Sequence, residues 1–183
     1  GIILSSGIGI KECIKSIKKI NQIPGRLEKI NIPKKLKNNN ISIFVDYAHT
    51  PDALAKVLKT LKKMTSNKLS IVFGCGGNRD LEKRPLMGKI AKKIADKIYI
   101  TDDNPRNESP KKIRSDILKT CSGAIEIASR YKAIKEAIKK CEFGEILLIA
   151  GKGHEDYQIF SRKTIKFSDK ETILKILKNK SFC

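Results

Sequence analysis

The chain has 183 residues, of which 40% are hydrophobic and 32% are charged, so it can bury a core and is not an intrinsically disordered chain. Its 39 Lys and Arg residues against 19 Asp and Glu residues give a formal net charge of +20, but the lysines are spread along the whole chain and no nucleic-acid-binding motif accompanies them. Five scattered cysteines without a CxxC pair argue against a disulfide framework or a zinc site and indicate a reducing compartment, and no apolar run is long enough to cross a bilayer.

The chain begins without Met and in the middle of a pattern, so we expect it to be a piece of a longer protein. Isoleucines recur at helical spacing over residues 10–20, which predicts an amphipathic helix. Pro24 and Gly25 then interrupt the pattern, so we place a domain boundary near residue 22 and a second domain over 23–183. The isoleucines of the predicted helix are Ile10, Ile14, Ile17 and Ile20.

After a polar, basic turn at residues 33–40, short apolar runs alternate with helical patterns. The expected strands cover 41–45, 69–73, 97–101, 124–128 and 145–150, and the expected helices cover 51–64, 85–95, 109–120 and 130–141. A β-hairpin around Ser161 and Arg162 is expected within 157–167, followed by a last helix at 169–179. This alternation predicts an α/β fold with a Rossmann-like, doubly wound, mostly parallel sheet, flanking helices and a C-terminal β-hairpin.

The helix at 51–64 carries the clearest start signals and the clearest apolar face. Thr50 is a suitable N-cap, Pro51 fits the first helical position, and Asp52 favours the positive end of the helix dipole. The apolar positions that should face the sheet are Leu54, Val57, Leu58 and Leu61.

Polar and glycine-rich clusters follow four of the five predicted strands. They cover residues 46–52, 74–80, 102–106 and 151–156. Because the carboxyl ends of parallel strands meet at one edge of a sheet, we expect these clusters to form a single binding crevice. Loops at the opposite edge, such as 65–68, contain only ordinary Thr, Ser, Asn and Lys residues.

The cluster that follows the third strand is the most unusual of the four. Residues 101–106 combine two carboxylates, an amide, a proline and a guanidinium. Pro105 restricts its own φ and favours extended geometry at Asn104, so the side chains on either side of it point in defined directions. An ordinary strand-to-helix turn would use the same Asp, Asn and Pro residues, and the cluster alone does not distinguish a turn from a binding site.

The side chains expected in the crevice suit a zwitterionic ligand. Arg79 and Arg106 each offer a planar pair of donors for a carboxylate or a phosphate, and Asn104 can both donate and accept. Glu155 and the aspartates can hold an ammonium group, and the glycines let backbone N–H groups approach a ligand closely. Taken singly, each arginine would more commonly form a surface salt bridge.

The remaining reactive residue types carry weaker signals. His49 and His154 have no Ser or Cys partner in a catalytic motif and are not at metal-ligand spacing, so we expect them to contact a ligand or organise a loop. Cys75 lies between glycines, and we expect a small buried residue rather than a nucleophile. We find no Walker A motif, and Gly74 and Gly76 lack the third glycine of the dinucleotide fingerprint.

Five motifs together resemble, in order, the C-terminal part of the MurE ligases, the UDP-N-acetylmuramoyl-tripeptide synthetases of peptidoglycan synthesis. They are Pro24-Gly25-Arg26-Leu27-Glu28, Asp46-Tyr47-Ala48-His49-Thr50-Pro51-Asp52, Gly74-Cys75-Gly76-Gly77-Asn78-Arg79-Asp80, Asp103-Asn104-Pro105-Arg106 and Gly151-Lys152-Gly153-His154-Glu155. The ordered set is specific, whereas the first two motifs alone would indicate only the wider superfamily of Mur ligases and folylpolyglutamate synthetases. The resemblance runs from about residue 22 to the end, and residues 1–22 resemble the tail of the family's central, ATP-binding domain.

The resemblance implies an ATP-dependent amide ligase of cell-wall biogenesis, which serves cell shape and division. In the family, ATP phosphorylates the carboxylate of UDP-MurNAc-L-Ala-D-Glu, and the amine of the incoming amino acid attacks the acyl phosphate. The implied partners are these two substrates and meso-diaminopimelate, and the implied cofactors are ATP and Mg²⁺. A cytoplasmic monomer without membrane or nucleic-acid partners is expected.

The resemblance also assigns roles to individual residues. It implies that meso-diaminopimelate is held by Arg79, Asp103, Asn104, Pro105, Arg106, Gly151 and Glu155. The motif from Asp103 to Arg106 matches the one that marks enzymes adding meso-diaminopimelate rather than lysine. Arg26, Asp46 and His49 match positions that approach ATP, Arg26 toward phosphate and Asp46 toward ribose.

Parts of the family pattern are missing from this chain. The UDP-binding domain, the P-loop, the magnesium ligands and the carbamylated lysine do not occur in it, so we expect no metal site and no catalysis by this chain alone, and its catalytic residues are unknown. Two alternatives remain open: a lysine-adding ligase of the same family, which Arg106 disfavours, and a non-catalytic basic binding module on a ligase scaffold, which only the net charge supports.

Overall fold

The computed structural model describes residues 5, 7, 9–17, 19–32 and 40–179. Its main sheet has six strands in the order β1-β2-β6-β3-β4-β5, and all neighbours are parallel except β1 and β2. The strands are β1 (Glu28–Lys29), β2 (Ser42–Asp46), β3 (Leu69–Phe73), β4 (Lys97–Ile100), β5 (Ile125–Glu126) and β6 (Ile146–Ala150). Because β6 lies between β2 and β3, loops that are about 75 residues apart in sequence become neighbours at the edge of the sheet.

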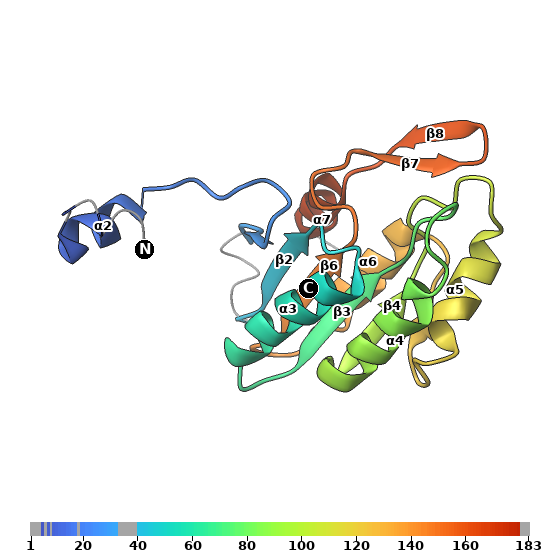
Figure 1. Cartoon of the computed structure of the whole chain (residues 1–183), viewed down its shortest axis with the longest axis horizontal. Helices are drawn as coiled ribbons and strands as arrows, with labels where there is room; N and C mark the ends of the chain where they lie inside the picture. The colour runs from blue at the N-terminus through green and yellow to red at the C-terminus, as the bar shows by residue number, and fades with distance from the viewer. Residues whose placement is uncertain (1–4, 6, 8, 18, 33–39, 180–183) are drawn as a thin grey trace.

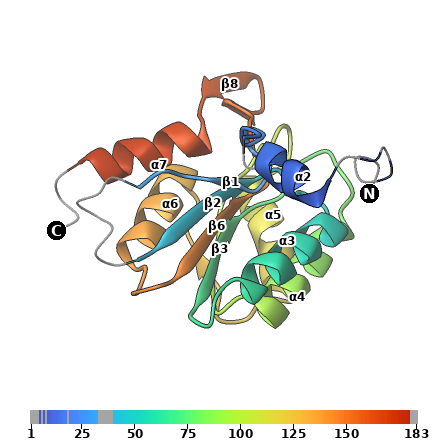
Figure 2. The ribbon, with the colours of Figure 1, turned by 90° about the vertical axis from the view of Figure 1, so that its left-hand side faces the viewer.

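Helices cover both faces of this sheet, as the strand–helix alternation predicts (Figure 2). One face carries α3 (Pro51–Lys63), α4 (Lys83–Ile94) and α5 (Pro110–Leu118), and the other carries α6 (Arg130–Lys139) and α7 (Asp169–Lys178). Strand residues contribute alternately to the two layers: Ile71 and Phe73 pack with α3 and α4, whereas Val72 packs with α6.

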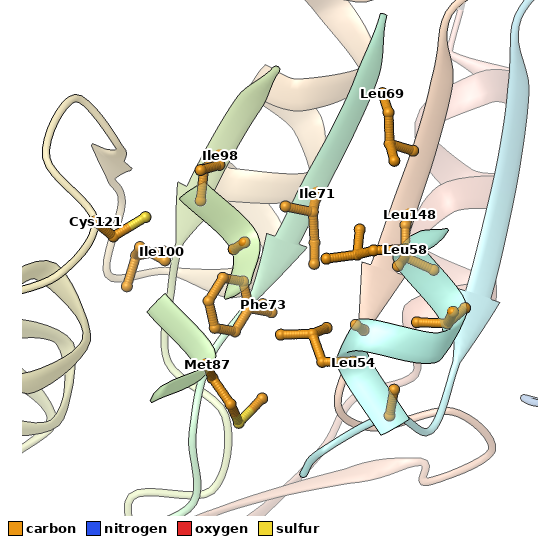
Figure 3. Packing of buried hydrophobic residues seen from close by; sticks show 14 of the residues in the cluster. Leu54, Leu58, Leu69, Ile71, Phe73, Met87, Ile98, Ile100, Cys121 and Leu148 are labelled. Carbon is orange, nitrogen blue, oxygen red and sulfur yellow. The ribbon is translucent and has the colours of Figure 1, made fainter. Parts of the chain in front are cut away.

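The larger apolar core lies between the sheet and α3, α4 and α5 (Figure 3). Each fully buried leucine or isoleucine there contributes about 1.5–3 kcal/mol of transfer free energy. The predicted apolar face of α3 is confirmed, because all four of its residues are buried: Leu54, Val57, Leu58 and Leu61. Its predicted start is confirmed as well, since Thr50 Oγ1 accepts a hydrogen bond from the Ala53 N–H and Pro51 is the first helical residue.

Most boundaries agree with the sequence pattern, and the differences occur at the edges of the sheet. The strand at 69–73 forms as expected, but the run at 124–128 contributes only the two residues of β5, where Ile125 is exposed. The pattern did not predict β1, an antiparallel strand of two residues. Nearly all of the turn expected at 33–40 lies outside the described residues.

Two further segments lie outside the main layers (Figure 1). The expected hairpin forms from β7 (Tyr157–Phe160) and β8 (Lys163–Lys166), with Ser161 in its turn at a φ of 49°. The N-terminal helix α2 (Ile10–Ile17) is shorter than the predicted 10–20, stands apart from the sheet, and exposes Ile10 and Ile14. No helix within the described ranges is long and apolar enough to cross a membrane.

Candidate functional site

A cavity of about 470 Å³ opens at the carboxyl ends of β2, β3, β4 and β6, where the four polar clusters of the sequence meet. The expectation of a single crevice is therefore confirmed, since each cluster contributes to its lining, and the hairpin adds Tyr157. The lining residues are Tyr47, His49, Thr50, Gly74, Cys75, Gly76, Arg79, Asp80, Lys83, Asp103, Asn104, Arg106, Gly151, Glu155 and Tyr157.

Arg106 is fixed at the corner that follows β4 by contacts of its backbone and of its side chain. Its backbone N–H donates to the carbonyl of Ile159 in β7 at 3.0 Å, which holds the residue at a left-handed φ of 52°. Its Nη1 donates to the carbonyl of Gly77 at 2.9 Å and lies 3.4 Å from the carbonyl of Asn104. Within the described chain, Nε and Nη2 have no protein acceptor, so they can donate to a ligand carboxylate in the bidentate way that guanidinium favours.

Arg79 supplies a second guanidinium from the loop after β3. It lines the same cavity, is exposed, and has no ion-pair partner among the residues that the structure describes. The Arg79 side chain is thus not held by an ion pair to a described residue, whereas hydrogen bonds fix the position of Arg106. Two guanidinium groups from adjacent loops therefore face one cavity, which favours a ligand with more than one acidic group.

Asn104 and Glu155 form the polar floor of the cavity, and a residue that the sequence did not single out lies beneath them. The Asn104 Nδ2 donates to Glu155 Oε2 at 3.1 Å, and the ammonium group of Lys152 lies 3.1 Å from Asn104 Oδ1 and 3.0 Å from Glu155 Oε2. Lys152 is completely buried and does not line the cavity. The one local signal for its burial is its position, between two glycines and directly after a buried strand.

Asp103 is another carboxylate in the cavity wall, and a buried arginine lies behind it. The Arg130 Nη1 is 3.9 Å from Asp103 Oδ2, while its Nε and Nη2 each lie 2.8 Å from a carboxylate oxygen of Asp169. Burial acts to lower the pKa of Arg130, but the charge of Asp169, assisted by Asp103 and Glu155, raises it overall. Gly151, at a φ of 112°, approaches so closely that a Cβ would lie 2.9 Å from Asp103 Oδ2.

Ion pairs around the cavity brace its loops from outside. Arg84, which is fully buried in α4, pairs with Glu108 at 2.9 Å and with Asp116 of α5 at 3.2 Å. Asp102 does not line the cavity but pairs with Arg114 of α5, although burial raises the pKa of its carboxyl group. Asp102, which precedes the motif from Asp103 to Arg106, thus lies outside the cavity lining and links the corner to a helix.

The three residues expected to approach ATP gather around Tyr47. The Arg26 guanidinium carbon lies 4.8 Å from the centre of the Tyr47 ring, and His49 Nδ1 is 2.9 Å from the Tyr47 carbonyl oxygen. Asp46 accepts the backbone N–H groups of Leu27 at 2.7 Å and Ala48 at 2.8 Å. Of these three expected residues, only His49 lines the cavity, so Arg26 and Asp46 lie beside it.

Pro105 and Cys75 have structural positions. Pro105 does not line the cavity, and its effect on the site is exerted through the conformations of Asn104 and Arg106. Cys75 touches the cavity but is buried, its Sγ lies 3.7 Å from Met87 Sδ, and burial raises the pKa of its thiol to about 12. A thiol that stays protonated is a poor nucleophile, so the expectation of a small buried residue is confirmed.

The described residues include no group of three or more His, Cys, Asp or Glu side chains that could hold a metal ion. The cavity instead combines the guanidinium groups of Arg79 and Arg106 with an amide and three carboxylates, those of Asp80, Asp103 and Glu155. Such a set can bind a ligand that carries both ammonium and carboxylate groups.

Comparison with known proteins identifies relatives over most of this chain. The family described as Mur ligase, glutamate ligase domain, matches residues 25–153. The chain is 50% identical over 177 residues to a UDP-N-acetylmuramoyl-L-alanyl-D-glutamate--2,6-diaminopimelate ligase of Rickettsia montanensis, which covers 94% of this chain and 35% of the relative. It is 46% identical over 188 residues to the ligase of the same name from Prochlorococcus marinus, which covers 98% of this chain and 36% of the relative.

A solved structure also resembles the chain closely. A UDP-N-acetylmuramoyl-L-alanyl-D-glutamate--2,6-diaminopimelate ligase matches it with a TM-score of 0.77 and 40% identity, over 94% of this chain and 35% of the solved chain. The chain thus spans 35–36% of the length of these relatives.

Proposed function

The chain belongs to the Mur ligase family, and on that basis we propose that it is the amino-acid-binding, C-terminal domain of a ligase that adds meso-diaminopimelate to UDP-MurNAc-L-Ala-D-Glu. The ligase would consume ATP and act in cytoplasmic peptidoglycan synthesis. Relatives that are 46–50% identical and bear the name of a diaminopimelate ligase support the choice of amino acid. This chain matches about a third of those relatives, so the complete reaction would also use regions equivalent to the rest of their length.

The observation that carries the proposal is the distribution of charge around the cavity. The guanidinium groups of Arg79 and Arg106 come from the loops after β3 and β4, while Glu155 and Asp103 supply carboxylates. A diaminopimelate molecule has two carboxylates and two ammonium groups, so it could satisfy both kinds of side chain at once. The arginines would hold its carboxylates, and the acidic residues would hold an ammonium group.

Arg106 would distinguish diaminopimelate from lysine. Lysine has no carboxylate at the end of its side chain, so it would leave the Nε and Nη2 groups of Arg106 unpaired in a closed site. Leaving a buried donor unsatisfied costs about 1–3 kcal/mol, and more for a charged group. A site built for the additional carboxylate would therefore reject lysine by at least tenfold.

The bound amino acid would attack an acyl phosphate on the UDP-MurNAc-dipeptide through its free amine. A C–N bond forms, the C–O bond to phosphate breaks, and the amine loses a proton. The contribution of this chain would be to hold the amino acid and to present Arg26, Asp46 and His49 toward ATP. ATP and Mg²⁺ would be bound mainly by the central domain. We also assign residues 1–22 to that domain. The exposed isoleucines Ile10 and Ile14 of α2 support this assignment, because they would be covered if the helix packed against another domain.

Substrate-dependent ADP release by the ligase that carries this chain tests the proposal. We expect turnover only when UDP-MurNAc-L-Ala-D-Glu and meso-diaminopimelate are both present, and the amide product should be detectable by mass spectrometry. L-Lysine and reactions without the dipeptide serve as controls. Equal turnover with lysine, or ADP release that does not depend on any amino acid, would rule out the proposed specificity.

A further inference from the structure

Lys152 is a charged group sealed beneath the floor of the cavity. It has no exposed surface and does not line the cavity, yet its ammonium group lies 3.0 Å from Glu155 Oε2 and 3.1 Å from Asn104 Oδ1, with the Tyr157 ring centre at 5.5 Å. A buried charge is tolerated only when it is paired, and both of these partners are cavity residues. Lys152 therefore cannot touch the amino acid directly but contacts two groups that can.

The contacts of Lys152 determine which way the Asn104 amide faces. Asn104 Oδ1 accepts from Lys152 and from the Ile159 backbone N–H, which lies at 3.1 Å. An ammonium group and a backbone N–H are both donors, so a flipped amide would place its NH₂ against two donors. The oxygen must therefore face these two groups, and the NH₂ must face Glu155 and the cavity.

The same ammonium group determines which oxygen of Glu155 remains free. Lys152 and the Asn104 NH₂ both contact Oε2, at 3.0 and 3.1 Å. In the described part of the chain, the hydrogen bonds and the ion pair of the Glu155 carboxylate are all at Oε2, and Glu155 lines the cavity. Oε1 is thus available for an ammonium group of the ligand.

From this geometry we propose that Lys152 is a positioning residue for amino-acid binding. It holds Asn104 as a donor and Glu155 as an oriented carboxylate, and it does so without touching the ligand. This inference rests on the proposed function, because it names the support of the same amino-acid site. Lys152 thus differs from the exposed lysines of this chain, because it is buried and supports the binding of the amino acid.

Steady-state kinetics of Lys152→Met in the complete ligase test the proposal. We expect the KM for meso-diaminopimelate to rise about tenfold, the effect of losing one hydrogen bond to a charged group, while the KM for ATP changes less than about twofold. Lys56→Met is the matched control, because Lys56 is exposed on α3 and forms an exposed ion pair with Asp52 there. An unchanged KM for diaminopimelate, or an equal rise in both constants, would overturn the role of Lys152.

The combined variant Lys152→Met with Glu155→Gln distinguishes positioning from general stabilisation. If Lys152 acts through Glu155 and Asn104, the combined KM should be far below the product of the two single effects. The combined variant removes both charges of the pair, so it leaves no unpaired buried charge from that pair. It can therefore be measured against Glu155→Gln even if Lys152→Met alone does not fold. A KM that is tenfold above that of Glu155→Gln alone would contradict the proposal.

A ligand-free measurement separates this inference from the proposed function. The side-chain NH₂ signals of Asn104, identified with Asn104→Asp, should shift in Lys152→Met and stay unchanged in Lys56→Met. Wild-type enzyme that does not use diaminopimelate would refute the proposed function, whatever those signals do. Asn104 signals that do not move in Lys152→Met would refute the positioning role, whatever the substrate is.

Discussion

The position of the Arg106 guanidinium depends on Gly76, which has no side chain, in the neighbouring loop. A Cβ added to Gly76 would lie 2.8 Å from Arg106 Nη1, closer than side-chain atoms tolerate. The nearest atom is the end of a flexible side chain, so the protein could relieve the clash by moving the guanidinium. Gly76 therefore acts on binding through Arg106 more than on folding.

We expect Gly76→Ala to raise the KM for meso-diaminopimelate about threefold to tenfold and to leave the melting temperature nearly unchanged. The reason is displacement of Arg106 from the position in which it can meet a carboxylate. Steady-state kinetics and thermal unfolding measure the two effects. Gly9→Ala is the control, because nothing lies within 4 Å of the added Cβ at that position. A variant with wild-type KM would show that the position of Arg106 is unimportant.

At the residue scale, the sequence predicted the cavity residues whose side chains are unusual directly after a strand. Arg79, Asn104, Arg106 and Glu155 all line the cavity. Lys152 was missed, because a lysine in a chain with this many lysines carries no signal of its own, and its burial arises from the packing of loops that are distant in sequence. Burial of a charge is a tertiary property that neither residue type nor periodicity reports.

At the scale of elements, a buried ion pair joins the two helices on one face of the sheet. Arg130 begins α6 and Asp169 begins α7, both are fully buried, and two hydrogen bonds of 2.8 Å connect them. Arg130 also donates to the carbonyl of Ala150 at the end of β6, at 2.9 Å. The pair thus fixes α7 against the loop that forms the cavity floor.

We expect Asp169→Asn to lower the free energy of unfolding by about 3–5 kcal/mol, because it leaves the Arg130 charge buried without a carboxylate beside it. Urea unfolding of the chain, followed by circular dichroism, measures the change. Lys56→Met breaks an exposed pair on α3 and should change stability by less than about 1 kcal/mol. Equal effects of the two variants would show that the buried pair contributes nothing special.

A second cluster of charges holds the opposite edge of the sheet. Glu142 accepts from Lys68, just before β3, and from Lys97 at the start of β4. These two hydrogen bonds lower the pKa of Glu142 to about 2. A carboxyl group whose pKa is lower in the folded state stabilises the fold above its ordinary pKa, and this stabilisation is lost as the pH falls through its folded value.

Glu142→Gln should therefore lower the melting temperature at pH 7, and the difference from wild type should shrink between pH 4.5 and about 2. Thermal unfolding across this range measures it, and comparison with wild type cancels the titration of the other carboxylates. Because these side chains are partly exposed, 0.5 M salt should reduce the difference at pH 7. A difference that is independent of pH would show that the two lysine contacts do not stabilise the fold.

The sequence predicted most of the elements but not the short strands at the sheet edges. The central strands are continuous apolar runs buried on both faces, which periodicity and length detect well; β3 and β6 are examples. In contrast, β1 has two residues, and its assignment depends on pairing with β2 across an intervening segment. Such a strand has no local pattern, so only the folded chain defines it.

At the scale of the whole molecule, the position of the site follows from the order of the strands. Five parallel strands place their carboxyl ends on one edge, and the insertion of β6 between β2 and β3 brings Gly151 and Glu155 beside the loops after β3 and β4. The sequence could predict the shared edge but not this order. Most of the positive charge is carried by lysines spread over the surface. Among the described lysines, Lys152 is the one that bonds to the floor residues Asn104 and Glu155.

The central claim is that Arg106 binds the second carboxylate of the incoming amino acid and so selects meso-diaminopimelate over lysine. Its most direct test is the ratio of kcat/KM for meso-diaminopimelate to kcat/KM for L-lysine, measured for the wild-type ligase and for Arg106→Ala. We expect the ratio to fall at least tenfold in the variant, because lysine has no carboxylate to lose, while the melting temperature and the KM for ATP stay close to wild type. A ratio that is the same in both enzymes would contradict the claim.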